Sequence, residues 1–444
     1  MHNAPKLSVV LGCLLLAASC GGGKPSPPPA EPTAPVTATI TARATTRPST
    51  PSADATIDVA PLRVGAPVPF PDNVALIIEV GCWQCDGDSG RLIRIYRDAA
   101  GVLQETPLIA GARPGGHTVS SDGSQIAYAW CSRGACDGFN PPSSDVQTTI
   151  GWSRDGGITS TAFAPLDGVY NVAAVVRGML LATGQTADMR SLPMRSYPSG
   201  DTFTPPPGGD HPIATGWDQL AFLTADRSTI LLGPDVESFD LGPGRQVNGI
   251  APADVAGNRF AIDWSERVTE TDVRSYKSIV SLTGPRLRIG IERTFLAEGS
   301  IGQSGGWLDP DTLIGTYEFH DADLPTHGAP VQGTGSRPLP ATFDLKTGTI
   351  HPILEPFLSE APYAHGRNFV LAVIRGPFAR VVNTGSCLNL RSEPRPDASA
   401  KTCAADNVLL RLLGEEESAG DITWFLAAMP DGTDGWVSSK FVAR

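Results

Sequence analysis

Two cysteine pairs are spaced in a way that could support disulfide, redox or metal chemistry. Cys82 and Cys85 enclose Trp-Gln, Cys131 and Cys136 form a wider pair, and Asp-Gly follows each pair. Thiol exchange is disfavoured for the first pair, because it lies between strand-like segments without the helix N-terminus that activates a thiolate. Four thiolates on zinc compete with two disulfides, which an oxidising compartment favours. Pairing within each loop is preferred over pairing between the loops.

A second cluster of polar side chains follows a strand-like segment near position 318. It combines three carboxylates and two imidazoles that could hold a divalent metal ion, namely Glu318, His320, Asp321, Asp323 and His327. Metal sites usually take ligands from separate rigid elements, so a solvated loop is the preferred interpretation. We expect no cofactor.

No residue set indicates hydrolysis. The histidines that follow position 20 lie outside any nucleophile elbow or zinc signature. A paired carboxylate or an arginine triad cannot be assigned from spacing alone. Whether the chain is an enzyme stays open, and a role without catalysis is preferred.

Composition narrows the possible partners and the fold class. The 444 residues carry a formal net charge of −12, which repels nucleic acid and anionic lipid heads. Gly (48) and Pro (40) are abundant while charged residues fall to 18 %, a balance that favours short strands joined by turns over helices.

The N-terminus has the layout of a secretory signal. Lys6 precedes an apolar run over 7–16 that is too short to span a bilayer, and Leu-Ala-Ala-Ser-Cys then ends at Cys20. This ending resembles the lipobox of bacterial lipoproteins, which implies a signal peptide over 1–19, acylation of Cys20 and an extracytoplasmic, lipid-anchored protein. A plain signal peptide is the alternative.

Residues 20–61 are rich in Pro, Thr, Ala and Ser and almost lack large apolar side chains. Such a segment cannot bury enough surface to fold, so we expect a disordered, semi-extended tether. It is either a stalk into the cell wall or an inert linker.

From 62 to 378 the sequence alternates short apolar runs with clusters of turn residues, which predicts an all-β domain. A recurring phrase of a turn followed by a central strand favours a propeller of six or seven blades, with six clear units and a partial seventh near 360–375. The phrase occurs in SSDGSQIAYAW, TADRSTILLG, DVAGNRFAIDWS and WLDPDTLIGTYEF. The first resembles TolB-type propellers, and SRDGGIT at 153–159 resembles the Asp-box of sialidase-type propellers, a structural motif.

Residues 379–444 resemble a bacterial SH3-like (SH3b) domain over their whole length. The resemblance is carried by LNLR at 388–391, Pro394, Trp424 and GWV at 435–437. Alternation predicts a small barrel with a core of Val381, Leu388, Leu390, Leu409, Leu412, Trp424 and Val437. A disulfide between Cys387 and Cys403 would stabilise so small a core.

The candidate recognition residues fall into two places. The segment 266–277, both cysteine loops and the loop after position 318 are each expected to join the second and third strands of a blade, and so to share one face. Candidate ligand contacts are Trp83, Asn389, Arg391, Trp424 and Trp436, although a tryptophan in so small a domain is more often core.

The expected function is binding at the bacterial cell envelope. The SH3b resemblance implies contact with peptidoglycan or envelope peptides, and the propeller face would bind a partner or glycan. The expected partners therefore include the membrane, through the lipid anchor, and no nucleic acid. An envelope hydrolase of sialidase or other glycosidase type, with the SH3-like domain as its targeting module, is the alternative. A sensor or assembly scaffold is a third possibility.

Overall fold

Strands make up nearly all regular structure, and η2 (Ser439–Phe441), a 3₁₀ turn, is the helical element among the described residues. The computed structural model describes 59–443 except 82–90, 99–100, 110–116, 121–122, 135–143, 155, 158–159, 177, 189, 215–219, 233–237, 252–258, 270–271, 284–287, 298–303, 321–335, 356–366 and 430–432. In this part of the chain no helix is long and apolar enough to cross a membrane. The expected signal peptide, Cys20 and nearly all of the tether lie outside it.

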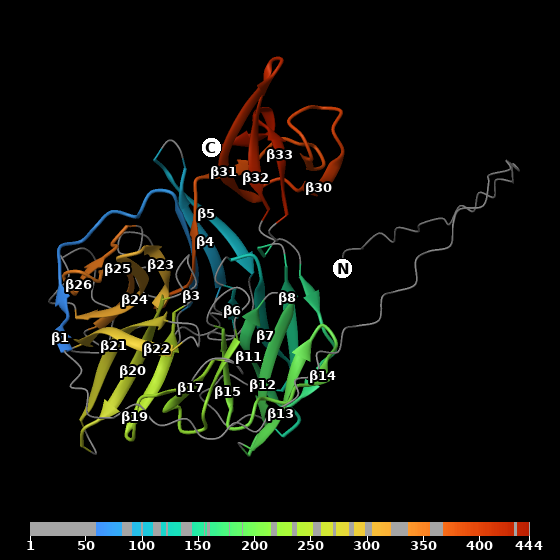
Figure 1. The fold of residues 1–444 in the computed structure, drawn as a ribbon. Coiled ribbons are helices and arrows are strands. Elements are labelled where there is room, and N and C mark those ends of the chain that lie inside the picture. The colour runs from blue at the N-terminus through green and yellow to red at the C-terminus, as the bar shows by residue number, and fades with distance from the viewer. Residues whose placement is uncertain are drawn as a thin grey trace, which may run out of the picture. The chain divides into compact units, whose positions relative to one another are not determined.

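Six antiparallel sheets form the blades of a six-bladed propeller (Figure 1). The strands of each blade are named in their order across the sheet, from the innermost to the outermost. Blade 1 is formed by β27 (Arg367–Arg375), β3 (Val74–Gly81), β4 (Arg91–Arg97) and β5 (Leu103–Ile109). Blade 2 is formed by β6 (His117–Val119), β7 (Ile126–Arg133), β8 (Gln147–Ser153) and β10 (Leu166–Asp167), with β9 (Thr161–Ala162) also on β8. Blade 3 is formed by β11 (Val169–Val176), β12 (Met179–Gln185), β13 (Ser191–Tyr197) and β14 (Asp201–Thr202).

The remaining three blades follow in chain order. Blade 4 is formed by β15 (His211–Ala214), β16 (Leu220–Leu223), β17 (Thr229–Leu231) and β18 (Phe239–Asp240). Blade 5 is formed by β19 (Arg245–Ile250), β20 (Arg259–Arg267), β21 (Val273–Thr283) and β22 (Arg288–Ala297). Blade 6 is formed by β23 (Ser304–Asp309), β24 (Thr312–His320), β25 (Ser336–Asp344) and β26 (Thr349–Pro352).

The ring closes in blade 1, where a strand from the end of the propeller pairs with three strands from its start. β27 pairs antiparallel with β3 from Arg367↔Gly81 to Arg375↔Val74, and it also contacts β23 and β6 of the two neighbouring blades. The apolar run that suggested a partial seventh blade near 360–375 is therefore the innermost strand of blade 1. A strand cannot reveal from its own sequence which distant strand it pairs with.

A short N-terminal segment, which we call the strap (59–70), adds a second connection across the ring. Its strands β1 (Val59–Pro61) and β2 (Arg63–Val64) pair in parallel with β22 and β26, the outermost strands of blades 5 and 6. Val68 then bridges to Ile353, and Phe70 is buried in the core with 1 % of its surface exposed. Two neighbouring blades are thus covered on their outer edges by one segment.

Blades pack face to face, so their central strands are apolar on both sides. Val74 to Val80 in β3 are all buried, and the one charged residue among them, Glu79, is 5 % exposed. A strand covered on both faces reads as a continuous apolar run, and blade-to-blade packing supplies that cover in this propeller.

The recurring turn phrase differs in position between the blades. Three of its four copies precede the second strand of a blade, as expected, but TADRSTILLG precedes β17, the third strand of blade 4. In this copy Asp226 accepts hydrogen bonds from the Ser228 amide (3.1 Å) and the Thr224 hydroxyl (2.6 Å). Such an Asp turn can join any two antiparallel strands, so the local sequence identifies a turn without fixing its place in the blade.

A seven-stranded antiparallel sheet follows the propeller after Gly376-Pro377, and we call it the terminal sheet. Its order is β30-β29-β33-β32-β31-β28-β34. Its strands are β28 (Phe378–Val381), β29 (Leu388–Arg391), β30 (Ala400–Ala404), β31 (Leu409–Ala419), β32 (Ile422–Ala428), β33 (Asp434–Ser438) and β34 (Val442–Ala443). Five of the seven predicted core residues share its apolar cluster, namely Val381, Leu388, Leu390, Leu412 and Val437.

The other two predicted core residues are buried elsewhere. Leu409 packs with Ala75, Tyr96 and Phe378 in a small cluster between blade 1 and the terminal sheet, and Trp424 lies outside the apolar cluster of the sheet. Alternation identified both as inward-facing positions, but it cannot separate the core of one domain from the interface with another.

Candidate functional site

The outer face of the terminal sheet brings together three of the predicted ligand contacts. Leu388 and Leu390 point inward, so Asn389 and Arg391 lie on the opposite face of β29, where Asn389 is exposed and Arg391 is half-buried. Trp436 on β33 lies directly opposite Arg391 in the register and is also half-buried. A half-buried indole beside a guanidinium offers a surface for stacking and hydrogen bonding.

Arg391 also has a structural contact. Its Nη1 donates to the carbonyl of Ala398 at 2.6 Å, which ties the loop between β29 and β30 to the sheet. Trp436 therefore supplies the aromatic surface of this face, and Arg391 also positions the neighbouring loop.

Trp424, the fourth predicted contact in this region, is not part of this face. Its side chain is 3 % exposed, and its Nε1 has no hydrogen-bond partner among the described residues. An indole so deeply buried cannot contact a ligand at the surface. The general preference of tryptophan for the core of a small domain holds for this residue.

The predicted disulfide between Cys387 and Cys403 is confirmed. It closes the β29–β30 hairpin over a sequence separation of 16, with the two Cα atoms 5.7 Å apart. Cys403 lies directly opposite Asn389 in the register, so the disulfide borders the face that carries Trp436.

The expected loop cluster on the propeller is consistent with the strand order. The segments after β3, β7, β20 and β24 all join the second strand of a blade to the third. Second strands run in the same direction in every blade, so β3, β7, β20 and β24 end at one face of the propeller, which we call the 2–3 face. The connection in blade 5 is shorter than predicted, because β20 and β21 extend to Arg267 and Val273.

Most predicted site residues at the 2–3 face lie outside the described residues. Cys82, Trp83, Cys85 and Cys136 are among them. Cys131, near the end of β7, is disulfide-bonded.

The proposed metal cluster is likewise only partly described. Glu318 is exposed near the end of β24, and His320 is the last residue of that strand, while Asp321, Asp323 and His327 fall outside. Among the residues that the structure places, no group of three or more His, Cys, Asp or Glu side chains could hold a metal ion.

Several charged groups are buried between the blades. Lys277, which the sequence placed in a polar loop, instead lies within β21, opposite Asp263 of β20, and forms an ion pair with it. Its ammonium group also lies 5.4 Å from the centre of the Tyr317 ring in blade 6. The side chains of Glu79 and His117 also lie close together between blades 1 and 2, with Oε1 and Nδ1 3.2 Å apart. These pairs are closed to solvent, so they serve blade packing.

An arginine in blade 1 has the same structural role. Arg94 Nη2 donates to the carbonyl of Gly156 at 2.8 Å, and burial lowers the pKa of its guanidinium to about 10. Gly156 belongs to the segment that resembles an Asp-box, in which the Ser153 hydroxyl accepts a hydrogen bond from the Gly157 amide at 2.9 Å. Asp155 of the same motif lies outside the described residues.

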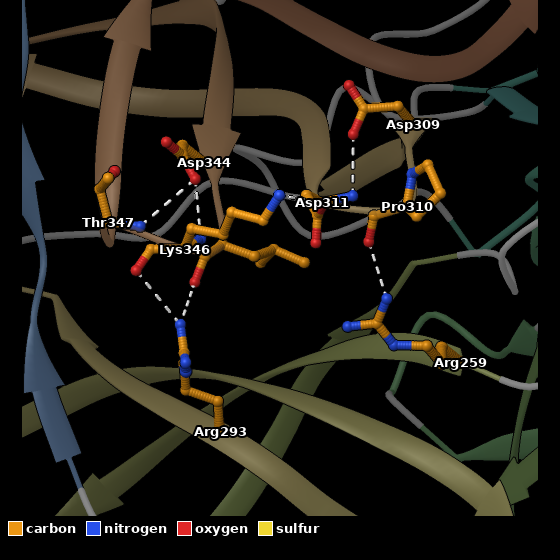
Figure 2. Close-up of polar contacts among 9 residues, drawn as sticks. Arg259, Arg293, Asp309, Pro310, Asp311, Asp344, Lys346 and Thr347 are labelled. Atoms are coloured by element: carbon orange, nitrogen blue, oxygen red, sulfur yellow. Dashed lines mark hydrogen bonds and ion pairs between the residues drawn. The ribbon is translucent and has the colours of Figure 1, made fainter.

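Figure 2 shows the polar seam between blades 5 and 6. Arg259 donates to the Pro310 carbonyl at 2.7 Å, and Arg293 donates to the carbonyls of Leu345 and Lys346. Asp344 accepts from the amide of Lys346 at 2.7 Å. Both guanidinium groups hold turns of blade 6, so this cluster is structural.

The innermost strands of the six blades carry no pair of carboxylates in the described part of the ring. Across the six innermost strands the only acidic residue is Asp309, whose Oδ1 accepts from the Asp311 amide at 2.8 Å. Glycoside hydrolysis ordinarily needs two carboxyl groups on either side of the scissile bond.

A cleft between blade 1 and the terminal sheet was not predicted. It has a volume of about 550 Å³, and its lining includes Tyr96, Arg97 and Gln104 from blade 1 with Phe378 and Arg380 from β28. The two sides come from parts of the sequence almost three hundred residues apart, so no local motif could indicate it.

Comparisons with known proteins show limited similarity. A candidate 6-phosphogluconolactonase from Bacteroides fragilis aligns with a TM-score of 0.32 and 10 % identity, over 84 % of this chain and 96 % of that chain. An exo-beta-1,3-galactanase from Clostridium thermocellum aligns with a TM-score of 0.30 and 9 % identity, over 86 % of each chain. No family model and no curated protein matches the sequence. The case for a function therefore rests on the residues of this chain.

Proposed function

We propose that this protein is a bacterial envelope lipoprotein, anchored through Cys20, that acts by binding. Its terminal sheet is an SH3-like domain that contacts peptidoglycan or envelope peptides, and its propeller binds a partner or glycan at the 2–3 face. The rival hydrolase lacks a supporting observation, because the described innermost strands carry no carboxylate pair.

One observation carries the proposal, namely the outer face of the terminal sheet with Trp436 between β29 and β32. Trp436 lies opposite Arg391 on one side and Leu426 on the other, which places an aromatic ring between a cation and an apolar side chain. Aromatic anchors with a neighbouring arginine are typical of binding surfaces. The SH3-like assignment is based on the sequence motifs LNLR and GWV, which lie on β29 and β33 of the sheet.

The test is sedimentation of the purified protein with insoluble peptidoglycan. Trp436→Leu keeps an apolar side chain but removes the aromatic face, and we expect wall binding to weaken about tenfold or more. Phe441→Leu is the matched control, because it removes an aromatic ring that is 38 % exposed in the same domain and lies outside both β33 and the lining of the cleft next to blade 1. Equal binding by Trp436→Leu and the wild type would contradict the proposed site.

Anchoring is tested separately by fractionation of cells. Cys20→Ala is expected to move the protein from the membrane fraction to the soluble extracytoplasmic fraction. A variant that stays fully membrane-bound would show that the anchor lies elsewhere.

A further inference from the structure

We propose that the cleft between blade 1 and the terminal sheet binds a short extended peptide that carries a free carboxylate and a free amine. This inference deepens the proposed function, on which it rests for the source of the peptide, and it names a site distinct from the Trp436 face. The volume of about 550 Å³ lies within the range of about 300 to 1,000 Å³ that is usual for ligand sites.

The cleft has an aromatic wall from three separate elements. Tyr96 lies near the end of β4, Phe378 begins β28, and Phe425 lies on β32. The rings of Tyr96 and Phe378 meet edge to face with their centroids 6.4 Å apart. Next to the lining glycines Gly101 and Gly414 are two exposed apolar side chains, Val102 (54 % exposed) and Leu413 (39 % exposed). Tyr96 and Phe425 are only 5 % and 7 % exposed and support the wall from behind, so the half-buried Phe378 ring and the two rim side chains supply the apolar surface for a bound peptide.

The backbone of β31 is interrupted where it borders the cleft. The register between β31 and β32 passes from Leu412↔Ala427 directly to Glu416↔Phe425, so the intervening residues 413–415 have no strand partner in β32. On its other edge β31 pairs with β28 only up to Arg411, and the Leu412 amide then donates to the Pro377 carbonyl at 2.8 Å. An interrupted strand edge is the kind of template to which an extended peptide adds.

Gly414 makes this interruption possible. Its φ of +89° is a backbone conformation that residues other than glycine rarely adopt, and nothing lies within 4 Å of the place where a Cβ would be. The bulge therefore opens onto free space, and the packing of the protein does not fill it.

The charges of the cleft indicate the ends of the peptide. Arg97 pairs with Asp72, with Nε and Oδ1 3.5 Å apart, so its charge is already balanced. Asp98 is used by its own turn, where it accepts from the Val102 amide at 2.9 Å. Arg380 is half-buried and makes no ion pair with any residue that the structure describes. A guanidinium in this position suits a carboxylate.

Glu415 supplies the opposite charge. It is exposed at the bulge of β31, lines the same cleft and has no ion pair among the described residues. A cation on the ligand would meet this carboxylate, while an anion would meet Arg380. A peptide with both groups fits the two sites better than a neutral glycan or a simple anion.

The experiment measures binding of a synthetic tetrapeptide, Lys-Val-Leu-Ala with both ends unblocked, to the full-length protein by titration calorimetry. We expect Arg380→Gln to weaken binding about tenfold, because a charge-assisted hydrogen bond to the peptide carboxylate is lost. Arg411→Gln is the matched control. It removes the same charge from an exposed position on the adjacent strand, opposite Phe378 and outside the cleft lining.

A second arm identifies the group that Arg380 contacts. Amidation of the peptide C-terminus should weaken binding to the wild type by the same factor and should have no further effect on Arg380→Gln, because both changes remove one interaction. The same comparison tests Glu415. The variant Glu415→Gln is paired with an N-acetylated peptide in which Gln replaces Lys, so that the peptide has no amine. Glu417→Gln is the control variant. Hydrogen exchange of the terminal sheet verifies that each variant is folded.

The outcomes separate this inference from the proposed function. Equal losses for Arg380→Gln and Arg411→Gln, or an amidation effect that persists in Arg380→Gln, would overturn the cleft assignment. Failure of the wild type to bind the unblocked peptide at millimolar concentration would overturn it as well, while Trp436-dependent wall binding would still stand. Conversely, Arg380-dependent peptide binding without any wall binding would support the cleft assignment and refute the proposed wall-binding site at Trp436.

Discussion

Removal of the Cys387–Cys403 disulfide is expected to loosen the terminal sheet without unfolding the propeller. The disulfide spans a sequence separation of 16, for which the chain-entropy model gives about 3 kcal/mol of stabilisation. A domain of this size loses roughly 4 to 8 °C in Tm per kcal/mol, so the double change Cys387→Ser with Cys403→Ser should lower the Tm of the terminal sheet by roughly 10 to 25 °C.

Hydrogen exchange gives the sharpest measurement of this effect, because it reports the terminal sheet separately from the blades. A loss of about 3 kcal/mol corresponds to exchange about 100-fold faster for amides of β31 and β32 that open with the domain. Amides of β20 and β21 in blade 5 serve as the internal reference, and Ser386→Ala, next to the disulfide, as the matched variant. Exchange in β31 and β32 that matches the wild type within twofold would refute the entropic account.

Three further predictions follow from the interior and the loops. Phe70→Ala should cost about 3 to 5 kcal/mol in the free energy of unfolding, measured with denaturant, because the ring, at the end of the strap, is 1 % exposed. Lys277→Met should cost about 3 to 5 kcal/mol by leaving the Asp263 carboxylate buried without its cation, and Lys277→Met combined with Asp263→Leu should recover most of that loss. Hydrogen bonds from the side chain and then the amide of Thr384 hold the pKa of Asp406 below its ordinary value, so an NMR titration should show this carboxyl ionised at unusually low pH, and Thr384→Val should raise its pKa.

Each of these predictions can be contradicted by a control variant or by the direction of a pH dependence. Val64→Ala in the same strap should be nearly neutral because Val64 is 49 % exposed, and a loss equal to that of Phe70→Ala would show that burial is not the cause. A Lys277→Met/Asp263→Leu variant no more stable than Lys277→Met would contradict the ion-pair argument. Because the folded pKa of Asp406 is the lower one, its contribution to stability is present above the unfolded pKa of about 3.9 and is lost as the pH falls through the folded value.

Local chemistry made part of the molecule predictable from its sequence. The strands, the propeller class and the Cys387–Cys403 disulfide depend on residues close together in the chain, and so does the hairpin alternation that places Asn389 and Arg391 on one face. The common face at which β3, β7, β20 and β24 end was also predictable, because it needs only the order of strands within each blade.

Long-range pairing made the rest unpredictable. The pairing of β27 with β3 and of the strap with blades 5 and 6 joins segments that are more than two hundred residues apart. Lys277 looked like part of a polar loop because its partner Asp263 is recognisable only once β20 and β21 are aligned. Arg380 belongs to no sequence motif, and it became a candidate binding residue only because it lines the cleft.

The two closures of the ring have a mechanical consequence. A pull on the N-terminal end of the described chain acts first on the strap, whose strands of three and two residues can detach in sequence while blade 1 stays closed through the nine residues of β27. A pull on the terminal sheet is transmitted instead through Gly376-Pro377 straight to β27, the strand that holds the ring together. The propeller therefore yields gradually to tension from one end, but tension from the other end loads the closure itself.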